Sequence, residues 1–289
     1  MFFCAGAVKA GTSWLWQYLR GHPECAVRAV KEVQYFDKLE EGTLGALAQR
    51  LRREIAALKA EIEGGDCRNP AWTRELLSAK REILKFVRDE APRDAEYLAY
   101  LTRHAGGRKL VADMTPEYGL LPAERLRDLA ALAPDVRFLF VMRDPVQRLW
   151  SHVRMLVRRA GATGADFAPA CADRFDAVLA GRAPDVTVRG DYRGIVGRLK
   201  AAVTPQRLMF AFYETLLTEP GIRDLTRFLG IAEHRPDLGR RMHEGTKLDM
   251  TASQRLRAFD WLADQYDFVA GAFGVPAAWD TRAQARLGA

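Results

Sequence analysis

The sequence has few of the residues that build metal clusters or disulfide frameworks. It contains four cysteines and five histidines in 289 residues. The cysteines form no Cys-x-x-Cys pair and the histidines show no ligand spacing, so neither a zinc site nor a disulfide framework is indicated. A reducing cytoplasm is therefore the expected location.

Long apolar runs are also missing. No stretch approaches the roughly 18 apolar residues of a membrane span, so none is expected. The N-terminus lacks the charged region and small-residue cleavage site of a secretory signal, and its first apolar residues are interpreted as a strand. Hydrophobic residues make up 48% of the chain, which is enough for a sizeable core. The length fits one large α/β domain or two smaller ones.

The charge is unbalanced toward basic residues. A net charge of +7 and an isoelectric point near 9.4 favour an anionic partner such as a nucleotide, an acidic saccharide or a nucleic acid. The arginines are spread among acidic residues, however, and form no basic tail or basic-aromatic stripe. Nucleic acid is therefore not expected as a partner.

Strand and helix patterns alternate along the chain. Four short apolar segments are the predicted strands: Phe2 to Ala7, Lys109 to Asp113, Val136 to Arg143 and Arg207 to Tyr213. Asp144-Pro145 supplies an N-cap and a first-turn proline for a helix to about Arg159. Glu219-Pro220 repeats this start before a helix that ends at Gly230. Buried strands that alternate with helices predict an α/β fold with a central parallel sheet.

Residues from about 39 to 106 have a different character. Leucine and isoleucine recur at steps of three and four from Leu44 to Ile62, which predicts a long amphipathic helix ended by Gly64-Gly65. Two further helices are expected over 71–89 and 94–104. This helical insertion is interpreted as a cap beside the sheet, with an oligomerisation arm as the alternative. The oligomeric state is left open.

A glycine-flanked loop, Gly6-Ala7-Val8-Lys9-Ala10-Gly11-Thr12-Ser13, follows the first strand and opens a helix. Backbone N–H groups and the positive end of the helix converge on one anion in such a loop. The glycine spacing is that of a nucleotide-triphosphate loop, but Thr12 stands where that motif has lysine, and the only lysine is Lys9. The loop therefore predicts a phosphorylated ligand other than ATP.

A second anion site is expected after the strand that ends at Arg143. This guanidinium lies at the carboxyl end of the strand, where ligands bind in open α/β sheets. Ser151 follows two helical turns beyond Asp144, so its hydroxyl can face the same crevice. A guanidinium and a hydroxyl suit a terminal phosphate. Arg148, between them, is interpreted as a helix-surface residue.

Together these segments resemble the sulfotransferases that use 3′-phosphoadenosine 5′-phosphosulfate (PAPS), nearest to the heparan-type and bacterial branch. Four blocks in family order carry the resemblance: Gly6 to Ser13 with Trp14 to Pro23, Lys31-Glu32-Val33-Gln34-Tyr35-Phe36-Asp37, Phe140 to Ser151, and Gly190-Asp191-Tyr192 with Phe212-Tyr213-Glu214. The resemblance covers most of the chain except the helical insertion and the extreme C-terminus.

The resemblance implies a P-loop-like three-layer fold and a single sulfotransferase domain over residues 1–289. It implies transfer of a sulfuryl group from PAPS to a hydroxyl or amine of a carbohydrate or small metabolite, with release of 3′,5′-ADP (PAP) and without a metal. Glu32 would be the general base and Lys9 would stabilise the leaving phosphate. The donor would be held by Lys9, Ala10, Gly11, Thr12, Ser13, Trp14, Arg143, Ser151 and Lys247.

The chain departs from the family pattern at two positions near the expected acceptor. Gln34 replaces a histidine, and Met114 replaces a lysine. Asp113 and Glu117 flank the second position and could contact a sugar or a basic acceptor, or else serve only as end-caps. Without the family blocks, Glu32 would be read as a surface carboxylate that pairs with Lys31 or Arg28.

Two other functions compete with a sulfotransferase. A P-loop-type kinase would need a lysine in place of Thr12 and a magnesium-holding acid, for which Asp113 is the only candidate. A non-catalytic nucleotide-binding protein would leave Glu32 without a chemical role. The identity of the acceptor is not encoded in any motif, because loops and insertions build acceptor pockets.

Overall fold

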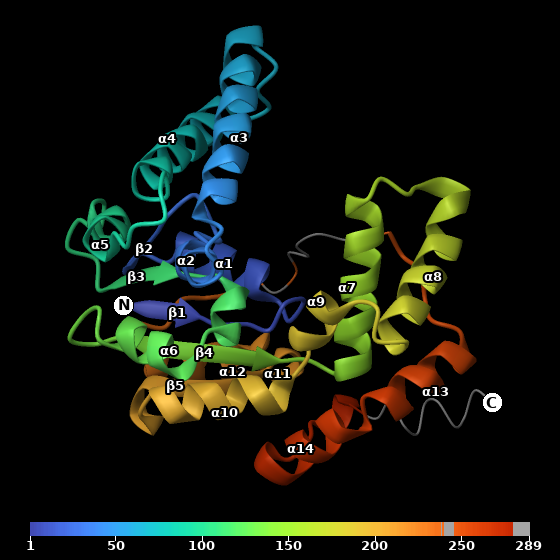
Figure 1. The fold of residues 1–289 in the computed structure, drawn as a ribbon. Helices are drawn as coiled ribbons and strands as arrows, with labels where there is room; N and C mark the ends of the chain where they lie inside the picture. The colour runs from blue at the N-terminus through green and yellow to red at the C-terminus, as the bar shows by residue number, and fades with distance from the viewer. Residues whose placement is uncertain (238, 240–245, 280–289) are drawn as a thin grey trace.

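The computed structural model describes residues 1–237, 239 and 246–279 and contains a five-stranded parallel sheet in the order β2-β3-β1-β4-β5 (Figure 1). The strands are β1 (Phe2–Cys4), β2 (Cys25–Val27), β3 (Leu110–Asp113), β4 (Arg137–Met142) and β5 (Leu208–Phe212). The predicted P-loop-like sheet flanked by helices is confirmed. The strand β2 was not predicted, because its three residues form no apolar run long enough to be recognised.

The strand β1 lies at the centre of the sheet. Phe2 pairs with Ala112 of β3 on one side and with Arg137 of β4 on the other. Hydrogen bonds to β4 continue past β1, from the Ala5 N–H to the Leu139 carbonyl at 2.9 Å and from the Ala7 N–H to the Val141 carbonyl at 2.8 Å. Because the strands are parallel, the segments that follow β1 and β4 leave the same edge of the sheet side by side.

Helices cover both faces of this sheet. They are α1 (Thr12–Gly21), α2 (Tyr35–Glu40), α3 (Leu44–Gly64), α4 (Pro70–Phe86), α5 (Asp94–Thr102), α6 (Ala123–Ala130), α7 (Pro145–Arg159), α8 (Phe167–Leu179), α9 (Pro184–Val188), α10 (Tyr192–Ala202), α11 (Tyr213–Leu216), α12 (Glu219–Leu229), α13 (Ala252–Trp261) and α14 (Ala263–Phe273).

Local chemistry explains where the predicted helices begin. The Asp144 carboxylate accepts a hydrogen bond from the Gln147 N–H at 2.8 Å, and Pro145 is the first residue of α7, as expected from the sequence. The N-cap of α12 is Thr218, whose hydroxyl accepts from the Gly221 N–H, rather than Glu219. That helix ends at Gly230 with φ of 68°.

The insertion between β2 and β3 consists of helices. In Figure 1 the paired helices α3 and α4 stand away from the sheet, while α5 lies near its β2–β3 edge. Buried aromatic rings hold the base of this insertion: Tyr35 of α2 stacks on Tyr97 of α5 at 5.3 Å, and Phe86 of α4 lies edge-on to Tyr35 at 5.5 Å. An ion pair between Arg28 and Glu82 of α4 at 2.6 Å also joins the insertion to the segment after β2.

Among the helices in the described part of the chain, none combines the length and the hydropathy needed to cross a bilayer.

Candidate active site

The loop after β1 presents unused N–H groups at the start of α1. Gly11 is the N-cap of this helix, no side chain caps it, and its first turn contains no acidic residue. The Gly11 carbonyl accepts from the Trp14 and Leu15 N–H groups. The N–H groups of Gly11, Thr12 and Ser13 donate to no other described residue. A helix start of this kind is suited to bind an anion.

Gly11 is required by two independent constraints. Its φ of 82° lies in the left-handed region, and a Cβ at this position would come within 2.7 Å of the Tyr213 ring. Tyr213 begins α11 directly after β5. The Arg143 guanidinium packs over the same ring, with its Cζ 4.8 Å from the ring centroid. The segments after β1, β4 and β5 therefore meet at one point.

Arg143 and Lys9 are joined directly. The Arg143 Nη1 donates to the Lys9 backbone carbonyl at 3.1 Å. The backbone of Arg143 is itself held by Tyr192, whose hydroxyl accepts from the Arg143 N–H at 3.1 Å and donates to its carbonyl at 2.6 Å. The loop after β1 and the end of β4, which separate motifs predicted to be anion sites, are thus in direct contact.

The surroundings of Lys9 are cationic. Partial burial, and after it the charges of Arg143, Arg159, Arg158 and Lys31, lower the pKa of the Lys9 amine to about 8. These four charges are all positive, which disfavours the protonated form of the amine. Such a cluster is stabilised when an anion binds among the cations, and perturbed amines of this kind concentrate at functional sites.

Glu32 lies beside this cluster on the segment after β2. Its carboxylate pairs with the Lys31 Nζ at 2.5 Å, and its side chain is 36% exposed. Arg28, the other partner considered from the sequence, pairs instead with Glu82. The Lys31 carbonyl accepts from the Met114 N–H at 3.3 Å, which places this segment next to the end of β3.

Asp113 is not an acceptor contact, contrary to one of the two interpretations of its sequence position. The residue is 1% exposed, and its carboxylate accepts hydrogen bonds from Tyr97 Oη at 2.8 Å, Tyr118 Oη at 2.9 Å and Thr115 Oγ1 at 2.7 Å. Burial raises its pKa to about 6 against the opposing effect of these hydrogen bonds. Asp113 therefore holds the core together beneath the site.

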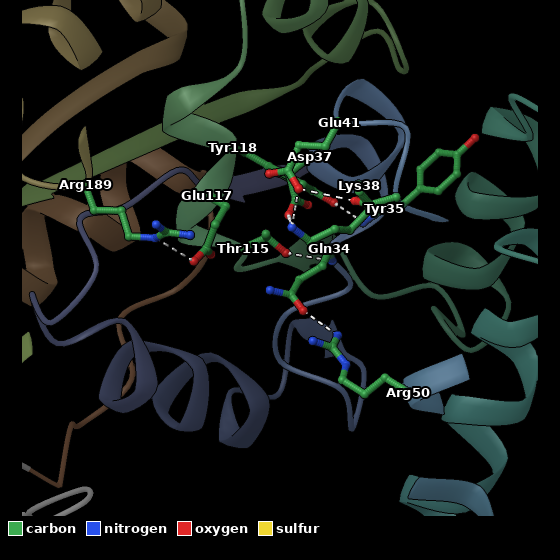
Figure 2. Close-up of polar contacts among 11 residues, drawn as sticks. Gln34, Tyr35, Asp37, Lys38, Glu41, Arg50, Thr115, Glu117, Tyr118 and Arg189 are labelled. Atoms are coloured by element: carbon green, nitrogen blue, oxygen red, sulfur yellow. Dashed lines mark hydrogen bonds and ion pairs between the residues drawn. The ribbon is translucent and has the colours of Figure 1, made fainter. Parts of the chain in front are cut away.

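Glu117 is placed nearer to open space. One carboxylate oxygen lies 3.4 Å from the Arg189 Nε, and the other is buried without a hydrogen-bond partner among the described residues (Figure 2). The neighbouring Asp37 is 4% exposed, and its ion pair with Lys38 is 3.5 Å long. Burial raises the pKa of Asp37 to about 7, with the Glu117 charge adding to the effect.

Arg148 is buried, which corrects its interpretation as a helix-surface residue. It is 1% exposed, and its guanidinium packs on Gly190, where a Cβ would come within 2.9 Å of Cζ. Its pKa is lowered by burial. His152, one turn later, is 3% exposed, and burial followed by the charges of Arg148 and other cations lowers its pKa to about 3. The prediction for Arg148 was wrong because other parts of the fold pack around α7 on several sides.

The remaining expected donor-binding residues occupy different surroundings. Ala10 and Thr12 are buried in the loop, while Ser13 and Ser151 are half-buried. The Trp14 ring stacks on Tyr18 at 5.5 Å, and its Nε1 donates to the Asp237 carbonyl at 3.3 Å. Lys247 is exposed and, within the described residues, joins none of the contacts around Lys9. The structure thus brings Lys9 and Arg143 into contact.

Two contacts at the site have no signal in the sequence. The Arg50 Nη2 of α3 donates to the Gln34 Oε1 at 2.5 Å (Figure 2). Arg189 reaches Glu117 from the end of α9, 72 residues away in the chain. Neither arginine belongs to a motif, so only the tertiary structure identifies them.

The arrangement combines an anion-binding loop, a partly desolvated amine and a half-exposed carboxylate. The loop N–H groups and Lys9 can hold and neutralise a phosphate, and Arg143 can bind a second one by its planar fork. Glu32 can accept a proton at the border with solvent. These are the parts needed to transfer a group from a phosphate to a hydroxyl or amine.

Comparisons with known proteins identify the family and the fold. The model of the "Sulfotransferase family" matches residues 2–235. The crystal structure of a sulfotransferase from Alicyclobacillus acidocaldarius superposes with a TM-score of 0.59 and 20% identity, covering 96% of this chain and 98% of that one. A sulfotransferase domain from the curacin biosynthetic pathway has a TM-score of 0.48 and 17% identity, covering 82% and 76% of the two chains. No curated protein sequence matches the chain.

The family model spans most of the chain, including the loop after β1, the segment around Glu32 and the start of α7. The structural likeness to the Alicyclobacillus enzyme extends over nearly the full length of both chains. The chain belongs to the sulfotransferase family.

Proposed function

We propose that this protein transfers a sulfuryl group from PAPS to a hydroxyl or amine of a carbohydrate or small-metabolite acceptor and releases PAP. The observation that carries the proposal is the environment of Lys9, whose amine is partly buried among four cations at the start of a helix. A ligand with several negative charges relieves this repulsion, and PAPS carries them on both its 5′ and its 3′ groups.

The residues present fit such a donor. The loop from Lys9 to Trp14 would hold the 5′-phosphosulfate, because the N–H groups of Gly11, Thr12 and Ser13 have no partner among the described residues. Arg143 and Ser151 would hold the 3′-phosphate, and Lys247 would approach the nucleotide. When bound, PAPS supplies an activated sulfuryl group on a phosphate that can leave.

Lys9 stabilises the charge that develops on the leaving phosphate oxygen. The N–H groups of Gly11, Thr12 and Ser13 hold the other phosphate oxygens at the positive end of α1. The backbone that carries these N–H donors is held before the reaction by Arg143 and by the close approach of Tyr213 to Gly11. Loss of one such preorganised donor costs about 10²–10³ in rate.

Glu32 acts as the general base toward the acceptor. Its carboxylate is half-exposed and is oriented by Lys31, so it can reach a proton on a group that arrives from solvent. General-base catalysis of this kind contributes about 10²–10⁴ in rate. Lys31 also lies close enough to Lys9 to affect its pKa, so the base and the anion site are adjacent.

Two features argue against the kinase alternative. Thr12 is buried where a nucleotide-triphosphate loop has its lysine, and Asp113, the only candidate for a magnesium-holding acid, is occupied by two tyrosines and a threonine. In the non-catalytic alternative, Glu32 has no chemical role and the helical insertion binds a partner. A Glu32 variant tests the first of these two differences.

Thermal denaturation with PAP and with ATP–Mg²⁺ separates these functions. A ligand at about 100 times its dissociation constant adds about 2.7 kcal/mol to the free energy of unfolding. We expect a clear shift with PAP and a smaller one with ATP–Mg²⁺. Transfer of labelled sulfate from PAPS to a panel of acceptors then tests catalysis, and Glu32→Gln should abolish transfer while leaving the PAP shift unchanged. A larger shift with ATP–Mg²⁺ would overturn the proposal.

A further inference from the structure

We propose that Arg50, from the helical insertion, positions the Gln34 amide so that it donates a hydrogen bond to the acceptor, and that this arrangement selects a hydroxyl over an amine. The inference rests on the proposed function, because it concerns the acceptor half of the same site. Its basis is the contact between α3 and the segment after β2, which no motif of the sequence indicates.

The Gln34 backbone is held in an uncommon conformation. Its φ of 57° and ψ of 36° lie in the left-handed region, where a residue with a long side chain is seldom found. The Gln34 N–H donates to the Thr115 Oγ1 at 3.3 Å, and Thr115 is fully buried. Strained conformations of this kind concentrate at functional sites, where the surroundings hold them in place.

Gln34 and Glu32 are separated by one buried residue, and both side chains are partly exposed. Val33, between them, is 2% exposed, and its N–H points to Asp113, whereas Glu32 and Gln34 are both half-buried. The buried residue thus anchors the segment while its two neighbours face outward. We infer that an acceptor at the proposed base Glu32 also meets Gln34, because the two residues are neighbours on either side of one buried anchor.

The contact with Arg50 determines which way the Gln34 amide points. A guanidinium has five N–H donors and no acceptor, so the amide group can meet it only with its oxygen. The observed distance of 2.5 Å from Arg50 Nη2 to Gln34 Oε1 agrees with this requirement. Figure 2 shows the amide nitrogen on the side turned away from Arg50. Gln34 therefore turns its two N–H donors, and not its oxygen, away from Arg50 and toward the acceptor.

The insertion also holds Arg50 itself. The Glu54 carboxylate, one turn along α3, lies 3.8 Å from the Arg50 Nε and 2.7 Å from the Lys80 Nζ of α4. The chain of contacts runs from α4 through Glu54 and Arg50 to Gln34. Helices α3 and α4 thus reach Gln34 through Arg50, and Arg50 is a positioning residue rather than a catalytic one.

A donor at this position favours a hydroxyl for a stereoelectronic reason. A hydroxyl oxygen has two lone pairs and one proton. One lone pair forms the new O–S bond, the other accepts from Gln34, and Glu32 takes the proton. The S–O bond to the donor phosphate breaks, and Lys9 neutralises the oxygen that receives the electron pair. A neutral amine has a single lone pair, which the new N–S bond consumes, so it has none for Gln34.

Two measurements test the contact between Arg50 and Gln34 and the selection of a hydroxyl over an amine. The first is the ¹H–¹⁵N nuclear Overhauser effect of the Gln34 side-chain amide, with the exposed Gln206 as reference. We expect Gln34 to be as rigid as the backbone in the wild type and as mobile as Gln206 in Arg50→Ala. The exposed Arg53, on the same helix, supplies the control Arg53→Ala, which should leave Gln34 rigid.

The second measurement uses matched alcohol and amine pairs, such as 2-phenylethanol with 2-phenylethylamine and glucose with glucosamine, and labelled PAPS. Within each pair we expect the label to be transferred to oxygen rather than to nitrogen. The ratio of the two rates should be about tenfold or more, in line with one well-placed hydrogen bond. Gln34→Glu, which turns the donor into an acceptor, should reduce that preference. Arg50→Ala should lower kcat/KM for the alcohol about tenfold, and Arg50→Lys should restore part of it.

The PAP thermal shift keeps the two proposals apart. If PAP fails to stabilise the wild type, the proposed function fails. Suppose that PAP stabilises the wild type and Arg50→Ala equally. If the Gln34 amide of the wild type is then as mobile as Gln206, or if the wild type labels the amines faster than the alcohols, the inference about Arg50 and the hydroxyl fails by itself.

Discussion

Arg143 and Lys9 lie 134 residues apart in the sequence, and the Arg143 Nη1 donates to the Lys9 carbonyl at 3.1 Å. This contact exists because β1 and β4 are neighbours in a parallel sheet, so the loops that follow them leave the same edge. It fixes the backbone of the loop after β1 and places the Arg143 guanidinium beside Lys9. The proposed donor site depends on this junction.

Lys9→Met should lower turnover by about 10²–10³, because it removes the cation that stabilises the leaving phosphate. Lys59→Met, at an exposed position of α3, is the matched control and should keep normal turnover. Initial rates of sulfate transfer at saturating PAPS measure the effect. Turnover within twofold of the wild type for the Lys9 variant would refute the role assigned to its amine.

PAP affinity should depend on pH through Lys9. The pKa of this amine in the free protein is about 8, so it is charged below that pH and neutral above it. Binding of an anion favours the charged form, so the dissociation constant should be constant below pH 8 and rise above it, by at most about tenfold per pH unit. Calorimetric titrations from pH 6.5 to 9.5 measure this, and proton uptake should appear near pH 9. Lys9→Met should abolish the inflection.

Arg143→Lys should weaken PAP binding by about tenfold, because lysine cannot reproduce a planar fork that contacts the Lys9 carbonyl, the Tyr213 ring and a phosphate together. If Arg143 binds the 3′-phosphate, affinity for 5′-AMP, which lacks that group, should change much less. The control is Arg207→Lys, because Arg207 precedes β5 and so lies at the end of that strand away from Tyr213. Equal losses for PAP and 5′-AMP would show that Arg143 acts only through the loop.

Gly11→Ala should abolish PAP binding and destabilise the fold. Gly11 and Gly65 have similar backbone conformations, with φ of 82° and 76°, but only at Gly11 would the added Cβ meet a ring at 2.7 Å. Gly65→Ala should therefore cost about 1 kcal/mol for the backbone strain alone, whereas the Gly11 variant should cost clearly more. Denaturant unfolding of the two variants gives the difference. Similar losses would mean that the contact with Tyr213 is not important.

Asp37→Asn should stabilise the protein at high pH. The pKa of Asp37 is raised from 3.8 to about 7, so the folded state binds this proton more tightly than the unfolded state does. Its contribution to stability is therefore fully present below pH 4 and is lost as the pH rises through 7. Asparagine avoids the buried charge, and the variant should gain on the order of 1 kcal/mol or more at pH 8 and little at pH 4.

The control for this change is Asp173→Asn, at an exposed position of α8. Unfolding free energies of both variants should be compared with the wild type at pH 4, 6 and 8. A constant difference across this range would contradict the raised pKa of Asp37.

Much of the fold was predictable because its signals are local. The strand β4 and the helix α7 were predicted close to their observed bounds, since an apolar run and the cap Asp144-Pro145 act over a few residues. The strand β2 escaped prediction because three residues carry no pattern. Its identity as a strand comes from pairing with β3, from Cys25 with Leu110 to Val27 with Ala112.

The candidate site was predicted only in part, for a similar reason. Lys9, Gly11 and Arg143 were identified by their motifs, and their roles in binding stay predictions that the variants above can test. Arg148 was misplaced, because burial on α7 depends on Gly190, which is distant in the sequence. Arg50 and Arg189 were missed, since a contact between remote helices and loops leaves no spacing that a single sequence reveals.

The sequence by itself determined the parallel sheet, the anion-binding loop and the membership of these parts in one family, because apolar period, turn glycines and caps act between near neighbours in the chain. The tertiary structure alone decided which side chains share the site: it placed Arg143 on Lys9, closed Asp113 off beneath two tyrosines and brought Arg50 to Gln34. Those relationships depend on desolvation and on charges that meet only after the chain has folded.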